Sequence, residues 1–180
     1  MNTYERIAGA FHRRIDCIAG AVDFLAAGVE QGAALLTQAV LEDHKILVLG
    51  TGSDAGLALA LAESLRGAEA GAPALPALAL THDDDVGTES ALWRDLRVLA
   101  RDGDVLLCLD TRSGAPLARA ASKLAQDRGL RFVSLAEGSQ SGAGDVAIEL
   151  NADDRPLRRE LLLMASHCLQ TEIRHLLLGE

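Results

Sequence analysis

Aromatic residues are scarce in this sequence: Phe, Trp and Tyr together make up 3% of its 180 residues. A buried core must therefore be built from Ala, Leu, Val and Ile. The apolar share of 49% and the charged share of 24% are ordinary for a globular protein. A chain of this length accommodates one domain with a sizeable core.

Cysteines and long uncharged apolar runs are also rare. Cys17, Cys108 and Cys168 are odd in number and widely separated, which argues against a disulfide framework or a clustered zinc site and indicates reduced thiols. Asp16 and Asp23 interrupt the apolar runs near the N-terminus, and no uncharged apolar segment reaches about 18 residues. We therefore expect no secretory signal, no membrane span and a cytoplasmic location.

Positive charge is in short supply, since the net charge is −9. No Lys/Arg cluster offers a surface to nucleic-acid phosphates, so we expect no direct nucleic-acid binding. The same charge disfavours a phosphorylated ligand, unless its pocket is locally basic or rich in backbone N–H groups.

The first part of the chain, residues 1–43, predicts an N-terminal helical arm. Apolar residues recur there at three- and four-residue spacing: Ile7, Phe11, Ile15, Ile18 and Val22, followed by a second run from Ala33 to Leu41. We expect a break between two helices within Gly28 to Gly32. Because the arm has no sheet of its own to cover, we expect it to pack against the domain body or a second subunit.

The body, residues 44–180, alternates short apolar strands with helices. Such alternation predicts one α/β domain over residues 1–180, with a three-layer, doubly wound (flavodoxin-like) parallel sheet of five strands. The last helix is apolar on most of its circumference, which predicts burial on all sides. Strands are expected at 45–50, 72–80, 104–110, 131–135 and 146–150, helices at 54–66, 88–101, 116–127 and 155–178, and a loop at 138–144.

Two loops follow strands at the carboxyl edge of this sheet, where ligands bind in doubly wound folds. Their glycines and the helix N-termini behind them favour close approach of an anion, although a structural turn or a capped helix start explains the same residues. No third glycine completes a dinucleotide-binding fingerprint in the first loop. The first loop comprises Gly50, Thr51, Gly52, Ser53 and Asp54; the second comprises Thr111, Arg112, Ser113 and Gly114, after Asp110.

Further landmarks occur in a fixed order around these loops. They are the string PALPALALT at 73–81, GDVLL at 103–107, and, on the last helix, Arg159-Glu160 followed by His167-Cys168-Leu169. With the helical arm and the two loops, this order resembles the sugar isomerase (SIS) family, in its phosphoheptose isomerase and DnaA initiator-associating branch. The resemblance covers nearly the whole chain, and the region around 83–96 looks shortened.

The resemblance implies site residues that this chain has partly lost. The family's phosphate-contacting serine of the first loop becomes Asp54, and its helix His and Glu, used for metal binding and proton transfer, become Ala60 and Ser64. Glu63 lies about 100° away from that face of the helix. On the last helix, Arg159 replaces a glutamine beside Glu160, and His167 is retained. His167 and Glu63 are thus weak catalytic candidates, and we expect no metal site and no cofactor, with zinc only in an active isomerase.

The second loop aligns with the family in two ways. Aligned directly, Asp110 falls on the first phosphate-contacting serine and Arg112 on the third position; with one inserted residue, Thr111 and Ser113-Gly114 restore the cradle. In the direct register two carboxylates, Asp54 and Asp110, would face a phosphate, each at a cost of about 4 kcal/mol at 4 Å and an effective dielectric of 20. Phosphosugar binding is then disfavoured.

Three functions remain open at this point. The first is a non-catalytic SIS protein that acts as an oligomeric binding or regulatory module, for which the resemblance implies a bacterial homotetramer and a protein partner such as the replication initiator DnaA. The second is an active isomerase of sedoheptulose 7-phosphate that uses Glu63, Asp54 or His167 in altered roles. The third is a sensor whose altered pocket binds a neutral or cationic ligand, as a variation on the family's binding of carbohydrate derivatives.

Overall fold

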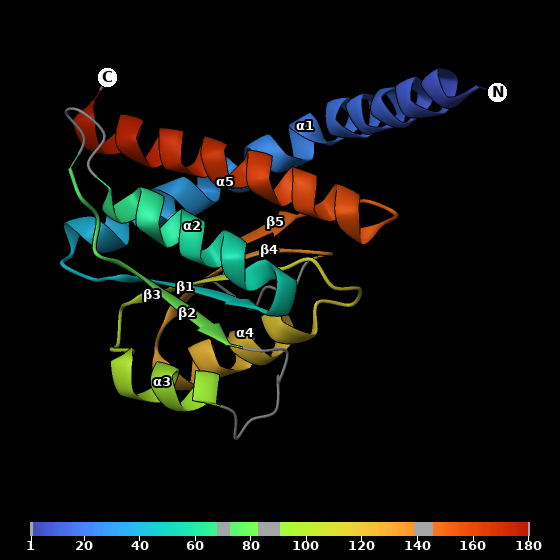
Figure 1. Cartoon of the computed structure of the whole chain (residues 1–180). Coiled ribbons are helices and arrows are strands. Elements are labelled where there is room, and N and C mark those ends of the chain that lie inside the picture. The colour runs from blue at the N-terminus through green and yellow to red at the C-terminus, as the bar shows by residue number, and fades with distance from the viewer. Residues whose placement is uncertain (1, 68–72, 83–90, 139–145, 180) are drawn as a thin grey trace.

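The computed structural model describes residues 2–67, 73–82, 91–138 and 146–179. Strands and helices alternate as predicted, so the α/β class is confirmed (Figure 1). The predicted helix start at 88–90, the beginning of the strand at 72 and most of the loop at 138–144 lie outside the described residues. In chain order the elements are α1 (Thr3–Leu41), β1 (Ile46–Thr51), the 3-10 helix η1 (Gly52–Asp54), α2 (Ala55–Arg66), β2 (Ala77–His82), α3 (Ala91–Leu99), β3 (Val105–Asp110), α4 (Pro116–Arg128), β4 (Arg131–Ala136), β5 (Val146–Glu149) and α5 (Arg155–Leu178).

The sheet is parallel throughout, with strand order β2-β1-β3-β4-β5. Every residue of β1 and β3 is buried, because helices cover both faces of these central strands. The chain runs from β1 outward to β2 and then returns to β3, so the direction of winding reverses between β1 and β3. This reversal confirms the doubly wound, flavodoxin-like fold and brings the loops after β1 and β3 side by side at the carboxyl edge.

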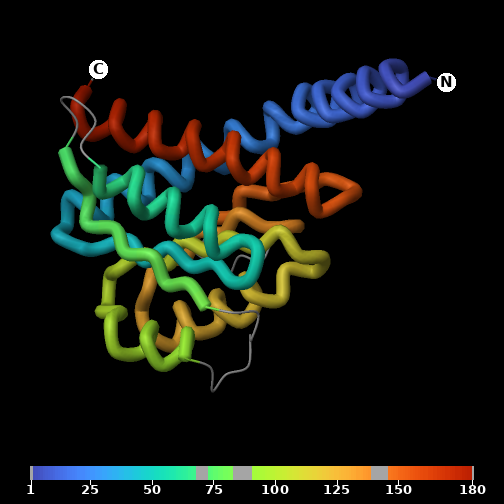
Figure 2. Tube along the Cα trace, viewed as in Figure 1, coloured from blue at the N-terminus to red at the C-terminus, as the bar shows by residue number. Residues whose placement is uncertain are grey.

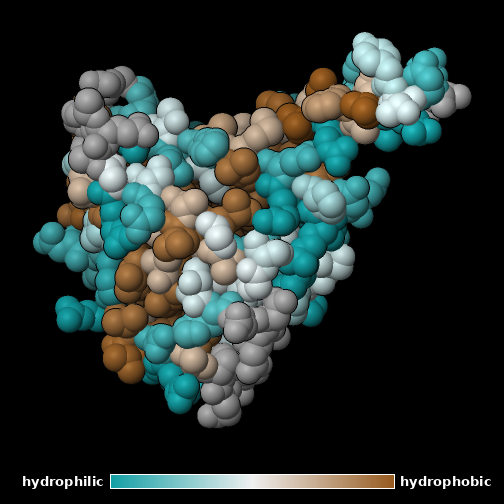
Figure 3. Space-filling view, viewed as in Figure 1, coloured by the Kyte–Doolittle hydropathy of each residue, from teal (hydrophilic) through white to brown (hydrophobic). Residues whose placement is uncertain are grey.

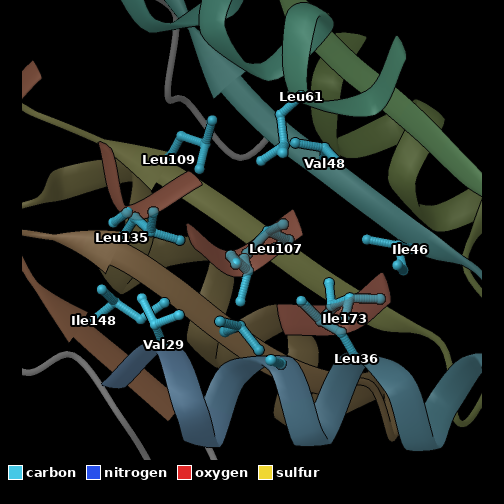
Figure 4. Packing of buried hydrophobic residues seen from close by; sticks show 14 of the residues in the cluster. Val29, Leu36, Ile46, Val48, Leu61, Leu107, Leu109, Leu135, Ile148 and Ile173 are labelled. Atoms are coloured by element: carbon cyan, nitrogen blue, oxygen red, sulfur yellow. The ribbon is translucent and has the colours of Figure 1, made fainter. Parts of the chain in front are cut away.

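Two apolar clusters fill the spaces between the three layers. The larger lies between the sheet and helices α1, α2 and α5, and the smaller lies between the sheet and helices α3 and α4. In Figure 4, Leu36 of α1 and Ile173 of α5 lie near Leu107 of the central strand β3, and Val29 of α1 lies beside Ile148 of β5. Aliphatic side chains dominate both clusters, as the scarcity of aromatic residues predicts.

Helix α1 is continuous from Thr3 to Leu41, so the predicted break within residues 28–32 is wrong. The glycines there serve close packing instead. A Cβ on Gly28 would lie 3.1 Å from the Ala147 carbonyl oxygen, and one on Gly32 would lie 3.4 Å from side-chain atoms of Ile148 and Leu169. The glycines thus let the helix backbone approach β5 and α5.

The N-terminal half of α1 projects beyond the body, whereas the C-terminus lies at the opposite end of α5 (Figures 1 and 2). Apolar side chains on this projecting half stay exposed; Phe11, for example, is 64% exposed. At 100° per residue, the apolar positions 4, 7, 11, 15, 18 and 22 fall within about 80° of one another. They continue the stripe that buries Leu25, Val29 and Leu36 against the body.

Helix α5 spans the predicted residues 155–178, but one chain does not bury it on all sides. Leu163, Met164, Leu176 and Leu178 are exposed. The exposed residues leave one side of α5 uncovered in the single chain. The expectation that a homotetramer buries this side remains a prediction.

By length and composition, α1 is long and apolar enough to cross a membrane, with a mean hydropathy of 1.3 over 18 residues. A core helix of a globular protein meets the same criterion, and the second half of α1 packs on the sheet. The expectation that no segment spans a membrane remains a prediction.

Candidate functional site

The first loop turns tightly against α2. Gly50 is the penultimate residue of the buried strand β1, and a Cβ there would lie 2.8 Å from both the Ala58 Cβ and the Asp54 carbonyl oxygen. The glycine is therefore required by the turn itself. The turn continues as η1 and delivers Asp54 to the point where the two loops meet.

Asp54 is turned into the protein, since it is 1% exposed. Its Oδ2 accepts a hydrogen bond from the Thr111 backbone N–H at 2.9 Å, and the Thr111 hydroxyl lies 2.8 and 2.9 Å from the two carboxylate oxygens. Asp54 thus ties the first loop to the second. The expectation that it faces a bound ligand as an unpaired charge is wrong.

Asp110 is fully buried at the N-terminus of α4. Its Oδ2 accepts hydrogen bonds from the backbone N–H groups of Leu117 at 2.7 Å and Ala118 at 3.2 Å. Its Oδ1 accepts from Arg112, through the backbone N–H at 3.2 Å and Nε at 2.9 Å. A helix N-terminus preceded by a glycine loop is a ready anion site, and here the chain's own carboxylate holds it.

Ser113 and Gly114 are engaged by a partner that the sequence reasoning missed. Arg158, only 3% exposed, donates hydrogen bonds to the Ser113 hydroxyl at 3.0 Å, the Thr111 carbonyl oxygen at 2.9 Å and Glu137 Oε1 at 2.9 Å. Glu137 in turn accepts from the Gly114 backbone N–H at 2.7 Å. The available signal was the position of Arg158 one turn before the apolar Leu161 and Leu162, because a buried arginine needs acceptors.

Two further arginines, Arg155 and Arg159 at the start of α5, lie near Asp54. Arg155 Nη2 is 3.6 Å from Asp54 Oδ2, and Arg159 Nε is 3.7 Å from Asp54 Oδ1. Asp110 has Arg112 as its counter-charge. The predicted double repulsion of a phosphate by two carboxylates is therefore wrong, because both carboxylates are buried beside guanidinium groups.

A cleft of about 600 Å³ opens between the first loop and the first turns of α5. Arg159 Nη2 donates to the Ser53 carbonyl oxygen at 2.9 Å across its edge. Glu160 is paired with Arg14 of α1 at 2.8 Å. The lining residues are Ser53, Leu57, Arg155, Pro156, Arg159, Glu160 and Leu163.

The positions that the family resemblance assigns to catalysis do come together, with His167 retained and Ala60 and Ser64 in place of the family's His and Glu. Ala60, Ser64 and His167 line one small cavity of about 80 Å³ between α2 and α5. The Ser64 hydroxyl donates to Gln170 Oε1 at 2.5 Å. One imidazole with no carboxylate does not fit zinc, which takes at least three protein ligands. Within residues 2–67, 73–82, 91–138 and 146–179, no group of three His, Cys, Asp or Glu residues could hold a metal ion.

Glu63, the other weak catalytic candidate, points away from this cavity. Its side chain is 60% exposed and pairs with Arg66 on the same helix. The structure thus brings His167 to the cavity and leaves Glu63 on the surface.

Among the thiols, burial raises the pKa of Cys108 well above its ordinary value, which keeps it protonated and unreactive.

No protein-family model matches the chain. The chain does, however, match individual proteins. It is 32% identical over 196 residues to the phosphoheptose isomerase of Methylococcus capsulatus, with 100% of both chains covered. It is also 32% identical over 197 residues to the phosphoheptose isomerase of Halorhodospira halophila, with 99% of this chain and 98% of the relative covered.

Solved structures agree with these sequence matches. Phosphoheptose isomerase GmhA from Neisseria gonorrhoeae has a TM-score of 0.81 at 25% identity, covering 96% of this chain and 98% of that one. A phosphoheptose isomerase from Francisella tularensis shares the fold with a TM-score of 0.82 at 22% identity, covering 97% and 100%. Full-length identity above 30% on the same five-stranded fold shows that this chain belongs to the phosphoheptose isomerase family of SIS-domain proteins.

Proposed function

We propose that this chain is a non-catalytic member of the family that acts as an oligomeric binding or regulatory module. The observation that carries the proposal is the commitment of the second loop to the chain's own carboxylates. The Thr111, Gly114, Leu117 and Ala118 backbone N–H groups donate to Asp54, Glu137 and Asp110. A phosphate at this loop would have to displace these carboxylates from the N–H groups that they already occupy.

The missing base supports the same proposal. Isomerisation through an enediol requires a group that moves a proton between adjacent carbons, within hydrogen-bond reach of both. The cavity between α2 and α5 holds His167 with Ala60 and Ser64, and Glu63 pairs with Arg66 on the surface. A single exposed imidazole leaves the proton transfer without the carboxylate that the family resemblance assigns to it.

An oligomer is the second part of the proposal, and exposed apolar surface supports it. The projecting half of α1 carries its apolar stripe uncovered, and a groove of about 440 Å³ between α1 and α5 continues it. Figure 3 shows brown hydrophobic side chains on this arm and again over the body on the same face. Contiguous apolar surface of this kind marks interaction sites. We propose a cytoplasmic homotetramer built on α1 and α5.

The proposed partner is a protein, and the family resemblance suggests the replication initiator DnaA. Affinity between the purified oligomer and purified DnaA, measured by surface plasmon resonance, tests this part. Binding that is lost on dissociation of the oligomer supports a scaffold role in replication initiation. A complete lack of binding at micromolar concentrations would remove DnaA as the partner.

Active phosphosugar isomerisation is the second candidate, and the names of the relatives favour it. Those relatives are called phosphoheptose isomerases and match the chain over its whole length. In that case, His167 would act with a base recruited from elsewhere, because Glu63 does not reach it.

A coupled assay with sedoheptulose 7-phosphate, run with and without added zinc, separates the two candidates. The isomerase from Methylococcus capsulatus serves as the positive control. We expect no product above the buffer rate from this chain. Turnover that disappears in His167→Ala would establish the isomerase in place of the binding module.

A further inference from the structure

We infer that the cleft between the first loop and α5 binds a small oxyanion, a carboxylate or phosphate with a short apolar part, on Arg155 and Arg159. This inference goes beyond the proposed function, since it assigns a ligand class and a binding mode to a different part of the molecule. The anion would lie on side-chain guanidinium groups, and not on the N–H groups at α4.

The first support is the incomplete engagement of the two guanidinium groups. Arg155 donates from Nε to the Thr111 hydroxyl at 3.1 Å, and its buried Nη2 has no hydrogen-bond partner. Arg159 donates from Nη2 to the Ser53 carbonyl oxygen at 2.9 Å. Their separations of 3.6 and 3.7 Å from the Asp54 oxygens exceed hydrogen-bond length. Both side chains line the cleft, 39% and 42% exposed, with donors left over.

The second support is the local balance of charge. Two arginines face the single carboxylate of Asp54, whose oxygens already accept hydrogen bonds from Thr111. Glu160, the other acid of the cleft, is paired with Arg14. One positive charge therefore remains in excess on the cleft wall, in a protein whose net charge is −9. Planar guanidinium groups with free donors recognise carboxylate and phosphate oxygens in pairs.

Apolar residues of the same lining suit the rest of the ligand. Leu57 of α2 and Pro156 and Leu163 of α5 present apolar surface to the cleft of about 600 Å³, which suits a ligand of a few carbon atoms. A neutral or cationic ligand, as the sequence suggested, does not match this cleft, because Asp54 is buried, Glu160 is paired with Arg14, and the two arginines are partly exposed.

Isothermal titration of the full chain at constant ionic strength tests the site, with inorganic phosphate, acetate and butyrate as probes. We expect phosphate to bind measurably, and butyrate to bind at least about threefold more tightly than acetate because it covers the apolar wall. Arg159→Gln and Arg155→Gln should each weaken phosphate binding about tenfold or more. Arg94→Gln, an exposed arginine on α3, is the matched control and should change it less than twofold.

The outcomes are separable from those of the isomerase assay. Phosphate binding that is unchanged in Arg159→Gln, or absent from the wild type, overturns the site. Should Arg155→Gln fail to fold after Asp54 loses a counter-charge, Arg159→Gln and the conservative Arg159→Lys decide, with thermal midpoints as the check on folding. Turnover of sedoheptulose 7-phosphate with normal phosphate binding would overturn the proposed function and leave this site standing.

Discussion

At the scale of single residues, Asp110 organises the second loop. Its carboxylate accepts the first free N–H groups of α4, whose N-cap residue Ala115 offers no side-chain acceptor and lies in the left-handed region at φ 43°. Removing a buried carboxylate leaves the donors that it accepted from without a hydrogen-bond partner.

We therefore expect Asp110→Ala to lower the free energy of unfolding by about 2–4 kcal/mol, because two backbone donors and Arg112 lose their acceptor. Urea denaturation followed by circular dichroism measures the loss. Asp127→Ala, an exposed aspartate in the last turn of the same helix, should change stability by less than about 0.5 kcal/mol. Equal effects of the two substitutions would contradict a structural role for Asp110.

Asp104 carries the pH dependence that the structure predicts best. Burial raises its pKa, but hydrogen bonds from the Lys45 side chain and from the backbone N–H groups of Lys45 and Arg101 outweigh burial and lower it below the ordinary value. Stability gained from a lowered pKa is present above the unfolded value of about 3.9 and is lost as pH falls through the folded value.

The comparison of wild type with Asp104→Asn should follow that curve. At pH 7 we expect the variant to be less stable by about 2 kcal/mol. The side-chain amide of asparagine has one acceptor oxygen and one NH₂ group, so the NH₂ group would take the place of a carboxylate oxygen that now accepts hydrogen bonds. Below about pH 4 the difference should shrink as Asp104 in the wild type takes up its proton. Urea midpoints from pH 2.5 to 7 measure this, and a gap of constant size over the whole range would rule the explanation out.

The sequence predicts in which loop or helix a residue lies better than it predicts the direction in which the side chain points. Asp54, Asp110 and His167 were placed in the right loops or helix by strand order and spacing. Their partners were not foreseeable, because a side chain's direction depends on residues that are distant in sequence. Arg158, 47 positions from the Thr111 carbonyl oxygen that it binds, is the clearest case.

At the scale of elements, α1 shows how packing overrides a local signal. Two glycines within a helical pattern indicate a break, but Gly28 instead lies against β5, where a Cβ would meet backbone atoms. Most strand and helix boundaries were predicted to within a few residues, since burial and periodicity report on the same side chains. The strand expected from residue 72 instead begins at Ala77. Contact between distant elements leaves no such local pattern.

Gly28→Ala should therefore destabilise the protein by about 1–3 kcal/mol, because the added methyl group forces α1 away from the sheet. The matched control is Gly20→Ala on the same helix, where a Cβ would meet nothing within 4 Å. That change should stabilise by up to about 1 kcal/mol through helix propensity. Thermal or urea unfolding measures both, and a stabilising Gly28→Ala would show that the contact is loose.

The uncovered stripe of α1 leads to a prediction about assembly. Phe11→Asp places a charge on the stripe, and it should weaken subunit association by about 2–4 kcal/mol and release smaller particles at micromolar concentration. Light scattering after size exclusion measures the mass. Gly20→Asp adds the same charge to the opposite side of the helix, in open space, and should leave the mass unchanged. A wild-type protein that is monomeric at all concentrations would refute the proposed oligomer.

At the scale of the whole molecule, the fold is that of the family, and we propose that the site differs. The five-stranded sheet, the long α1 and the matching α5 agree with phosphoheptose isomerases over their full length. At the carboxyl edge Asp54 accepts from Thr111, Asp110 accepts from the first turn of α4, and Glu137 accepts from Gly114. We therefore propose that the chain keeps the family's fold without its chemistry.

The measurement that tests this separation most directly is proton NMR of sedoheptulose 7-phosphate with the zinc-supplemented protein in D₂O. Passage through an enediol exchanges a carbon-bound hydrogen or yields the isomeric aldose. We predict neither deuterium at carbon nor aldose above the buffer rate, under conditions where the isomerase from Methylococcus capsulatus gives both. Incorporation or conversion by the wild type, abolished in His167→Ala, would contradict the non-catalytic account.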